Sequence, residues 1–96
     1  MIIQFHSEAR KEFFEAADYY EEQMLGLGDV FIDEVEKVLK VIEQQPASGT
    51  KITKKERRFI VSRFPYGIIY SVEKEQILIF AVMNLKRKPG YWISRT

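Results

Sequence analysis

The chain has 96 residues, 46% of which are hydrophobic, and its formal net charge is only +1. This length predicts one domain, residues 1–96, with a single modest core. The absence of cysteine excludes disulfides, thiolate nucleophiles and cysteine-based zinc sites. No apolar stretch is long enough for a membrane span, and no signal peptide opens the chain. We therefore expect a cytoplasmic protein that does not associate with membranes.

The small net charge hides an uneven distribution along the sequence. Residues 1–46 contain eleven acidic and four basic residues, whereas residues 47–96 contain three acidic and eleven basic residues. The two halves therefore carry net charges of −7 and +8. A positive second half favours an anionic or acidic partner. Alternatively, the two halves attract each other within the fold.

The N-terminal half predicts a short strand followed by two helices. Residues 2–5 (IIQF) are β-branched and aromatic, which is typical of a strand. Ser7 is expected to cap an amphipathic helix of about four turns, because apolar residues recur every three or four positions and carboxylates fill the other side. LGLG at 25–28 ends this helix. Asp29 is expected to cap a second helix that Pro46 ends, giving an antiparallel αα-hairpin.

The C-terminal half predicts a basic loop and then a sheet. The loop covers residues 47–56, and FPYG at 64–67 is expected to form a turn in which Gly67 takes special backbone angles. Strands are expected at three places, namely 57–63, 67–72 and 76–84. Because their connections are short, neighbouring strands must be antiparallel, which gives a three-stranded β-meander. The predicted fold class is therefore α+β.

The strand at 76–84 is unusual because both its faces are apolar. Strict alternation would place Ile77, Ile79, Ala81 and Met83 on one face and Leu78, Phe80 and Val82 on the other. A sheet with one wet face should alternate apolar and polar residues. Either both faces are covered within the chain, or one face awaits a partner. In the second case the protein alone should be poorly soluble or form a homodimer.

Few residues have the spacing of a catalytic or metal site. His6 has no second histidine or cysteine to share a metal, so we interpret it as structural or surface-exposed. Glu56 stands among bases, and an ion pair with Arg57, Arg58 or a lysine is its expected role, with general-base catalysis as the alternative. No Gly-rich phosphate loop is present. We expect neither a metal nor a cofactor.

The remaining candidates are cations interleaved with aromatic residues. Such sets suit phosphate contacts and base stacking, although cations on edge strands also deter aggregation. In NLKRKPGYW at 84–92, three bases precede Pro-Gly and two aromatics. We expect Pro89-Gly90 to turn the chain so that Tyr91 and Trp92 lie back on the sheet.

The order of elements, together with RRFIVSRFPYGIIYSVEKEQILIFAVMNLKRKPGYW, resembles the RelE/ParE toxins of type II toxin–antitoxin systems. PYGIIY, the AV strand and the basic R-x-P-x-Y-W end are similar to the ParE branch, the plasmid stabilisation toxins. The resemblance implies a RelE/ParE-like fold and a cognate antitoxin that wraps the helices and sheet. For the ParE branch it also implies inhibition of DNA gyrase and growth arrest.

The RelE branch offers an alternative, a ribosome-dependent endoribonuclease acting on mRNA. By its pattern the catalytic candidates would be Arg58, Arg87 and Tyr91. However, Ile60 and Gly67 stand where that pattern has a lysine and an arginine, and Asn84 replaces a histidine common in the ParE-like strand end. A non-enzymatic toxin is therefore the preferred interpretation, and an inactive antitoxin-binding member of the fold is the third.

The contact residues expected for such a toxin fall into two sets. The candidates for contact with the target are Arg57, Arg58, Arg63, Lys86, Arg87, Lys88 and Trp92. The candidates for contact with the antitoxin are Phe13, Tyr20, Leu78, Phe80 and Val82.

Overall fold

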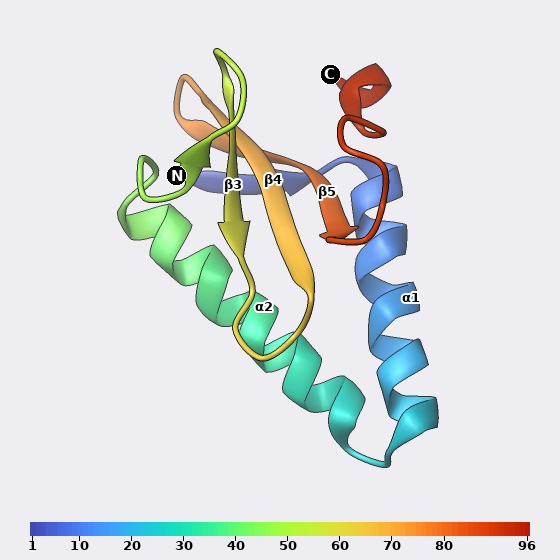
Figure 1. Ribbon diagram of the computed structural model, residues 1–96. Helices are drawn as coiled ribbons and strands as arrows, with labels where there is room; N and C mark the ends of the chain where they lie inside the picture. Colours follow the sequence, from blue (N-terminus) through green and yellow to red (C-terminus); the bar gives the residue numbers. More distant parts are fainter.

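The computed structural model describes residues 1–96 and contains two long helices and a five-stranded sheet (Figure 1). The elements are β1 (Ile2–Phe5), α1 (Ser7–Gln23), α2 (Leu27–Gln44), β2 (Thr50–Lys51), β3 (Glu56–Ile60), β4 (Tyr66–Glu73), β5 (Gln76–Asn84) and a short 3-10 helix, η1 (Ile93–Arg95). The predicted α+β class, αα-hairpin and antiparallel meander are confirmed. Neither long helix has the length and apolar character needed to cross a membrane.

The sheet has the strand order β1-β5-β4-β3-β2. The N-terminal strand β1 pairs in parallel with β5, while the other neighbours are antiparallel. The helical hairpin therefore connects β1 to the meander across one face of the sheet. Strand β2 lies inside the segment expected to be a loop, and it was missed because two residues carry no periodic pattern.

The helix caps differ from those predicted. His6, not Ser7, is the N-cap of α1, and its Nδ1 accepts a hydrogen bond of 3.1 Å from the Glu8 N–H. This observation gives His6 the structural role expected for it. Ser7 is the first residue of the helix itself, because the helix starts one residue earlier than a serine cap would require.

The second helix is capped from α1 and not by Asp29. Gly26 precedes it with a φ of 88°, a left-handed conformation that glycine adopts without steric cost. The Glu21 carboxylate accepts hydrogen bonds from the N–H groups of Gly26 (2.9 Å) and Gly28 (3.0 Å). Two helix-end donors are thus satisfied by the neighbouring helix, which links the two arms of the hairpin.

The turn between β3 and β4 is longer than predicted. Strand β3 ends at Ile60, and Arg63, predicted to lie in the strand, takes a φ of 72°, which is outside the β region. Gly67 does not supply the special backbone angle. Its missing side chain matters instead for packing: a Cβ there would lie 3.1 Å from the Cγ of Arg58 and 3.3 Å from Leu85.

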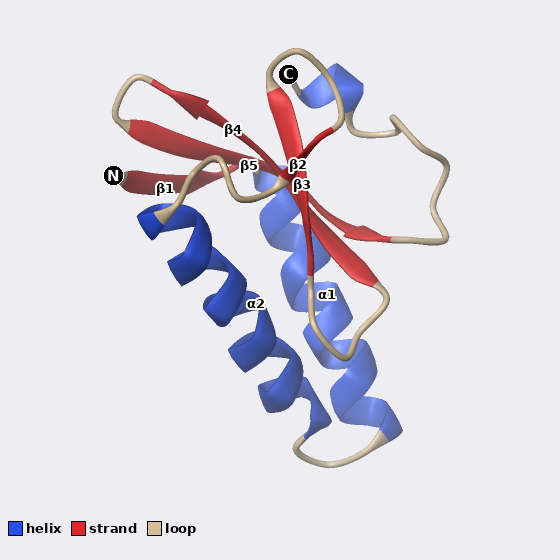
Figure 2. Cartoon of the chain, turned by 60° about the vertical axis from the view of Figure 1, so that its left-hand side comes forward, coloured by secondary structure: helices blue, strands red, loops and turns tan.

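Each face of the sheet has its own apolar layer. Figure 2 shows both helices on one side of the sheet, which we call the helix face. The core of that face contains Phe31, Val35, Ile42, Ile68, Tyr70, Ile77, Ile79 and Val82. The other side, the tail face, is covered by residues 85–96, the tail. Its smaller cluster consists of Ile69, Phe80, Ala81, Met83 and Trp92.

The strict alternation predicted along β5 is wrong because the strand contains a β-bulge. Ile79 pairs with Tyr70 and Ala81 pairs with Ile69, so Phe80 is the extra residue. The bulge reverses the alternation, and Val82 therefore joins Ile79 on the helix face while Ala81 joins Phe80 on the tail face.

The tail packs on the second apolar face of the sheet. Trp92 is only 3% exposed and packs into the tail-face cluster, with Tyr91 against its edge. The prediction that both aromatics fold back on the sheet is confirmed. The tail therefore covers part of this face, while Leu78 and Phe80 still line an open hollow.

Candidate functional site

The tail is fastened to the fold through Glu12, in the second turn of α1. Its Oε2 accepts a hydrogen bond of 2.7 Å from the Tyr91 hydroxyl, and the Arg95 guanidinium donates to both carboxylate oxygens at 2.9 and 3.0 Å. Its Oε1 also accepts from the Val82 N–H, beside the bulge, at 3.0 Å. We call Glu12, Tyr91 and Arg95 the tail clamp. It joins three segments that are distant in the sequence.

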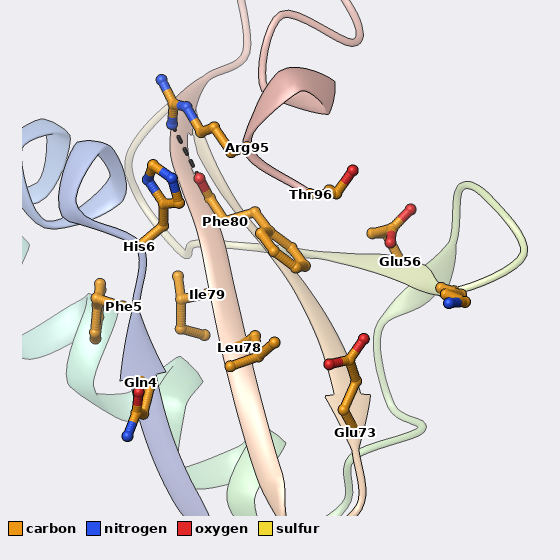
Figure 3. A pocket seen from close by; sticks show the side chains of 11 residues that line it. Gln4, Phe5, His6, Glu56, Glu73, Leu78, Ile79, Phe80, Arg95 and Thr96 are labelled. Carbon is orange, nitrogen blue, oxygen red and sulfur yellow. Dashed lines mark hydrogen bonds between the residues drawn. The ribbon is translucent and has the colours of Figure 1, made fainter.

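Arg95 completes the clamp by reaching the bulge itself. Its Nη1 donates a hydrogen bond of 2.9 Å to the carbonyl oxygen of Phe80, drawn as the dashed line in Figure 3. The hydrogen bond to Glu12 raises the pKa of Arg95, against the opposing effect of burial. Both side chains of the pair are largely shielded from water, with exposed fractions of 12% and 15%. A bidentate pair in such a position is strong and directional.

Sequence reasoning missed both charged members of the clamp. Glu12 was grouped with the other α1 carboxylates as part of a solvated face, and Arg95 was not singled out. One signal was present: Glu12 lies three residues after Ala9 and four before Ala16, both buried, so it falls within the inward stripe of the helix.

The Tyr91 hydroxyl is held in its protonated form. Burial raises its pKa above the ordinary 10.0, and the hydrogen bond to Glu12 raises it further, while Arg95 and Arg87 oppose the rise only in part. A phenol that donates to a carboxylate at neutral pH is a poor proton acceptor.

The raised pKa of Tyr91 predicts how stability depends on pH. Above about pH 10 the unfolded chain loses this proton while the folded chain keeps it, so the free energy of unfolding should fall as pH rises. Tyr91→Phe should flatten the decline. Some slope should remain, because burial also raises the pKa of Tyr20. Urea unfolding of both proteins between about pH 9 and 11 measures the slopes, and identical slopes would contradict the assignment.

Arg87 projects from the connection that follows β5. Its guanidinium carbon lies 3.9 Å from the centre of the Tyr91 ring, a cation–π contact that ties the connection to the clamp. Both residues line a hollow of about 260 Å³, with Glu15, Tyr19 and Tyr66 on its other walls. Lys86 and Lys88 flank Arg87, and all three cations are exposed and free of ion pairs. We call residues 86–88 the basic connection.

Arg58 lies in a different hollow, of about 360 Å³, on the tail face. The Arg58 hollow lies between the β2–β3 connection and the tail, and its main apolar walls are Ile52, Ile69, Met83, Trp92 and Ile93. The stem of Arg58 crosses Gly67. The three residues expected for a nuclease therefore do not share one site, because Arg58 lines one hollow and Arg87 and Tyr91 line another.

A third hollow, of about 450 Å³, opens near the upper end of the tail face. Figure 3 shows Leu78 and Phe80 between the carboxylates of Glu56 and Glu73 on one side and Arg95 on the other. The ion pair expected for Glu56 is wrong: its carboxylate accepts a hydrogen bond from the Thr53 hydroxyl instead. No three histidine, aspartate or glutamate side chains come together as metal ligands would.

The other residues expected to contact a target have structural contacts. Arg57 donates to the carbonyl oxygens of Ala47 (3.1 Å) and Gly49 (2.8 Å), which holds β2 and the preceding loop against β3. Arg63 pairs with Glu34 of α2 at 3.6 Å, and Trp92 is buried. Of the six cations among these candidates, only those of the basic connection and Arg58 have side chains without a hydrogen-bond acceptor or a carboxylate partner.

Two of the three ion pairs in the chain join its acidic and basic halves, namely Arg95 with Glu12 and Arg63 with Glu34. The attraction between the acidic and the basic half of the chain therefore acts in part within the fold. Among the cations expected to contact a target, the basic connection and Arg58 form no such pair, and a partner can therefore use them.

The residues expected to contact an antitoxin vary in accessibility. Phe13, Tyr20 and Leu78 are partly buried. Phe80 is 7% exposed beneath the tail, and Val82 is 2% exposed beneath α1.

Comparison with known proteins places this geometry in a family. A family model described as "ParE toxin of type II toxin-antitoxin system, parDE" matches residues 3–89. Among solved structures, the chain is similar to one titled "Chromosomal ParDE TA system from P. aeruginosa", with a TM-score of 0.69 and 16% sequence identity over 88% of this chain and 95% of that chain. At that identity the likeness shows the fold alone. No curated protein sequence matches.

Proposed function

Because the chain belongs to the ParE toxin family of type II toxin–antitoxin systems, we propose that it acts by binding DNA gyrase and is neutralised by a cognate antitoxin. The gyrase target follows from the resemblance of residues 57–92 to the ParE branch. The observation that carries the proposal is the basic connection, three exposed cations without carboxylate partners on a segment fixed by the tail clamp.

Attachment to the clamp suits the basic connection to recognition. A loop whose cations are already oriented loses less conformational entropy on binding than a free one. Arg87 rests on the Tyr91 ring, and Tyr91 is in turn held by Glu12. Exposed like charges of this kind steer association with an acidic or phosphate-bearing surface, in keeping with action on a DNA-bound enzyme in the cytoplasm.

The geometry favours binding over ribonuclease chemistry. Phosphodiester cleavage requires groups that converge on one phosphate, whereas Arg58 and Arg87 line separate hollows. The Tyr91 hydroxyl, in addition, already donates to Glu12 and retains its proton.

Four measurements distinguish the candidate functions. Growth arrest on induction, relieved by co-expression of an antitoxin, tests for a toxin. Inhibition of gyrase supercoiling by the purified protein would support the proposal. Cleavage of mRNA on programmed ribosomes would support the ribonuclease instead. Antitoxin binding without either effect would leave an inactive member of the fold.

Removing the charges of the basic connection should weaken gyrase inhibition. In the triple variant Lys86→Ala, Arg87→Ala and Lys88→Ala we expect the inhibitory concentration to rise about tenfold or more, because oriented charges are lost from the contact surface. Supercoiling assays measure the change.

A matched control removes three exposed lysines elsewhere, in Lys51→Ala, Lys54→Ala and Lys55→Ala. Equal losses in the two variants would show a general charge effect and would contradict a specific role for the basic connection. The unfolding free energy of both variants should stay within about 0.5 kcal/mol of the wild type per site.

A further inference from the structure

The Arg58 hollow combines apolar walls with a single charge. Ile52 and Ile93 form part of its rim and are 37% and 56% exposed, while Met83 and Trp92 lie deeper. Arg58 is its one charged lining residue. No carboxylate of the chain therefore offsets the guanidinium there.

The state of Arg58 indicates a missing acceptor. Its Nε is buried and has no hydrogen-bond partner, and none of the three ion pairs in the chain involves it. A buried donor without an acceptor destabilises a fold, and more so when the group is charged. The stem packs closely over Gly67, where a Cβ would lie 3.1 Å from the Cγ of Arg58.

We propose that the Arg58 hollow binds an acidic and apolar segment of the antitoxin. A carboxylate of that segment pairs with the guanidinium, and an apolar side chain beside it packs between Ile52, Met83 and Ile93. The chemistry of the occupant follows from the hollow, and its identification as the antitoxin rests on the proposed function. The net charge of +8 on residues 47–96 adds long-range attraction for an acidic segment.

The same features disfavour a nucleic acid in this hollow. A phosphate backbone is bound by several cations along a groove, with aromatic rings on which bases stack. Here a single guanidinium stands among aliphatic side chains, and the one aromatic ring, Trp92, is buried. A planar guanidinium in apolar surroundings suits a bidentate carboxylate.

Two peptides that differ by one charge test the proposal. We would titrate the full-length protein with Ac-GLELG-NH2 and with Ac-GLQLG-NH2 while recording the NMR signals of the Arg58 Nε–H and the Trp92 indole N–H. The acidic peptide should shift both signals with a dissociation constant of about 1 mM, and the neutral peptide should bind about tenfold more weakly. Equal affinities, or no shift of either signal at about 10 mM, would overturn the proposal.

Variants show whether Arg58 reads the charge. In Arg58→Gln the difference between the two peptides should disappear, and in Arg58→Lys it should be reduced, because lysine keeps the charge but not the planar fork. Lys54→Gln, an exposed cation of the β2–β3 connection, should keep the full difference. If Arg58→Gln kept the full difference in affinity between the two peptides, another residue would recognise the carboxylate and the proposal would be overturned.

These measurements are independent of toxicity. Failure of the peptides to discriminate overturns the hollow as a carboxylate site and leaves growth arrest and gyrase inhibition unaffected. Absence of growth arrest would overturn the proposed function, while the peptide titration would still report on the hollow.

Discussion

Replacing Glu12 with alanine is expected to lower the free energy of unfolding by about 3 kcal/mol, the lower end of the range for breaking a buried ion pair. The change removes the acceptor of three donors at once: the Tyr91 hydroxyl, the Arg95 guanidinium and the Val82 N–H. The lower end applies because the side chains of Arg95 and Glu12 keep some contact with water, with exposed fractions of 12% and 15%. Urea unfolding followed by tryptophan fluorescence measures the loss.

Two further variants test whether the loss of stability comes from the tail clamp or from removing any carboxylate of α1. Glu15→Ala removes an exposed carboxylate of the same helix and should change stability by no more than about 0.5 kcal/mol. Glu12→Leu combined with Arg95→Leu should recover part of the loss, because an apolar pair replaces an unpaired buried charge. A loss below about 1 kcal/mol in Glu12→Ala would mean that the tail is held mainly by its apolar contacts.

The regular elements were predictable because their patterns are long or chemically distinct. Strand β1 at 2–5 and strand β5 at 76–84 have the predicted bounds. Their β-branched and aromatic residues favour a strand. The αα-hairpin followed from apolar spacing, with LGLG at the joint between its helices and Pro46 after the second helix.

Interactions between distant residues were not predictable in this way. A bulge at Phe80 depends on register with β4, and no feature of β5 alone indicates it. The α2 cap comes from Glu21, five and seven residues before the N–H groups that it accepts from. Glu12 finds its partners 70 to 83 residues away. Local patterns contain no information about such contacts until the fold brings them together.

This difference explains why the candidate site was only partly found. The cations were identified by residue type, but which of them are available depended on carbonyl groups and carboxylates elsewhere. Arg57 donates to carbonyl groups and Arg63 pairs with a carboxylate. The side chains of the basic connection and of Arg58 have no such partner.

Trp92→Ala should have an effect on stability comparable to that of Glu12→Ala, about 3 kcal/mol, at the lower end for removing a buried tryptophan. Trp92 is the largest member of the tail-face cluster, and without it Ile69, Phe80 and Met83 lose their cover. The uncovered face should also promote self-association, because an exposed apolar patch favours a partner. Urea unfolding measures the first effect, and light scattering on a sizing column measures the second.

The same variant distinguishes an anchoring role for Trp92 from the target contact first expected of it. An anchor that is 3% exposed reaches a target only if the tail moves, so weaker gyrase inhibition should appear together with lost stability and a dimer. Trp92→Phe should recover much of the stability and restore a monomer, while Ile93→Ala, which removes a side chain 56% exposed, should cost no more than about 0.5 kcal/mol. Weaker inhibition by a monomer of unchanged stability would contradict the anchoring role and indicate that Trp92 contacts the target directly.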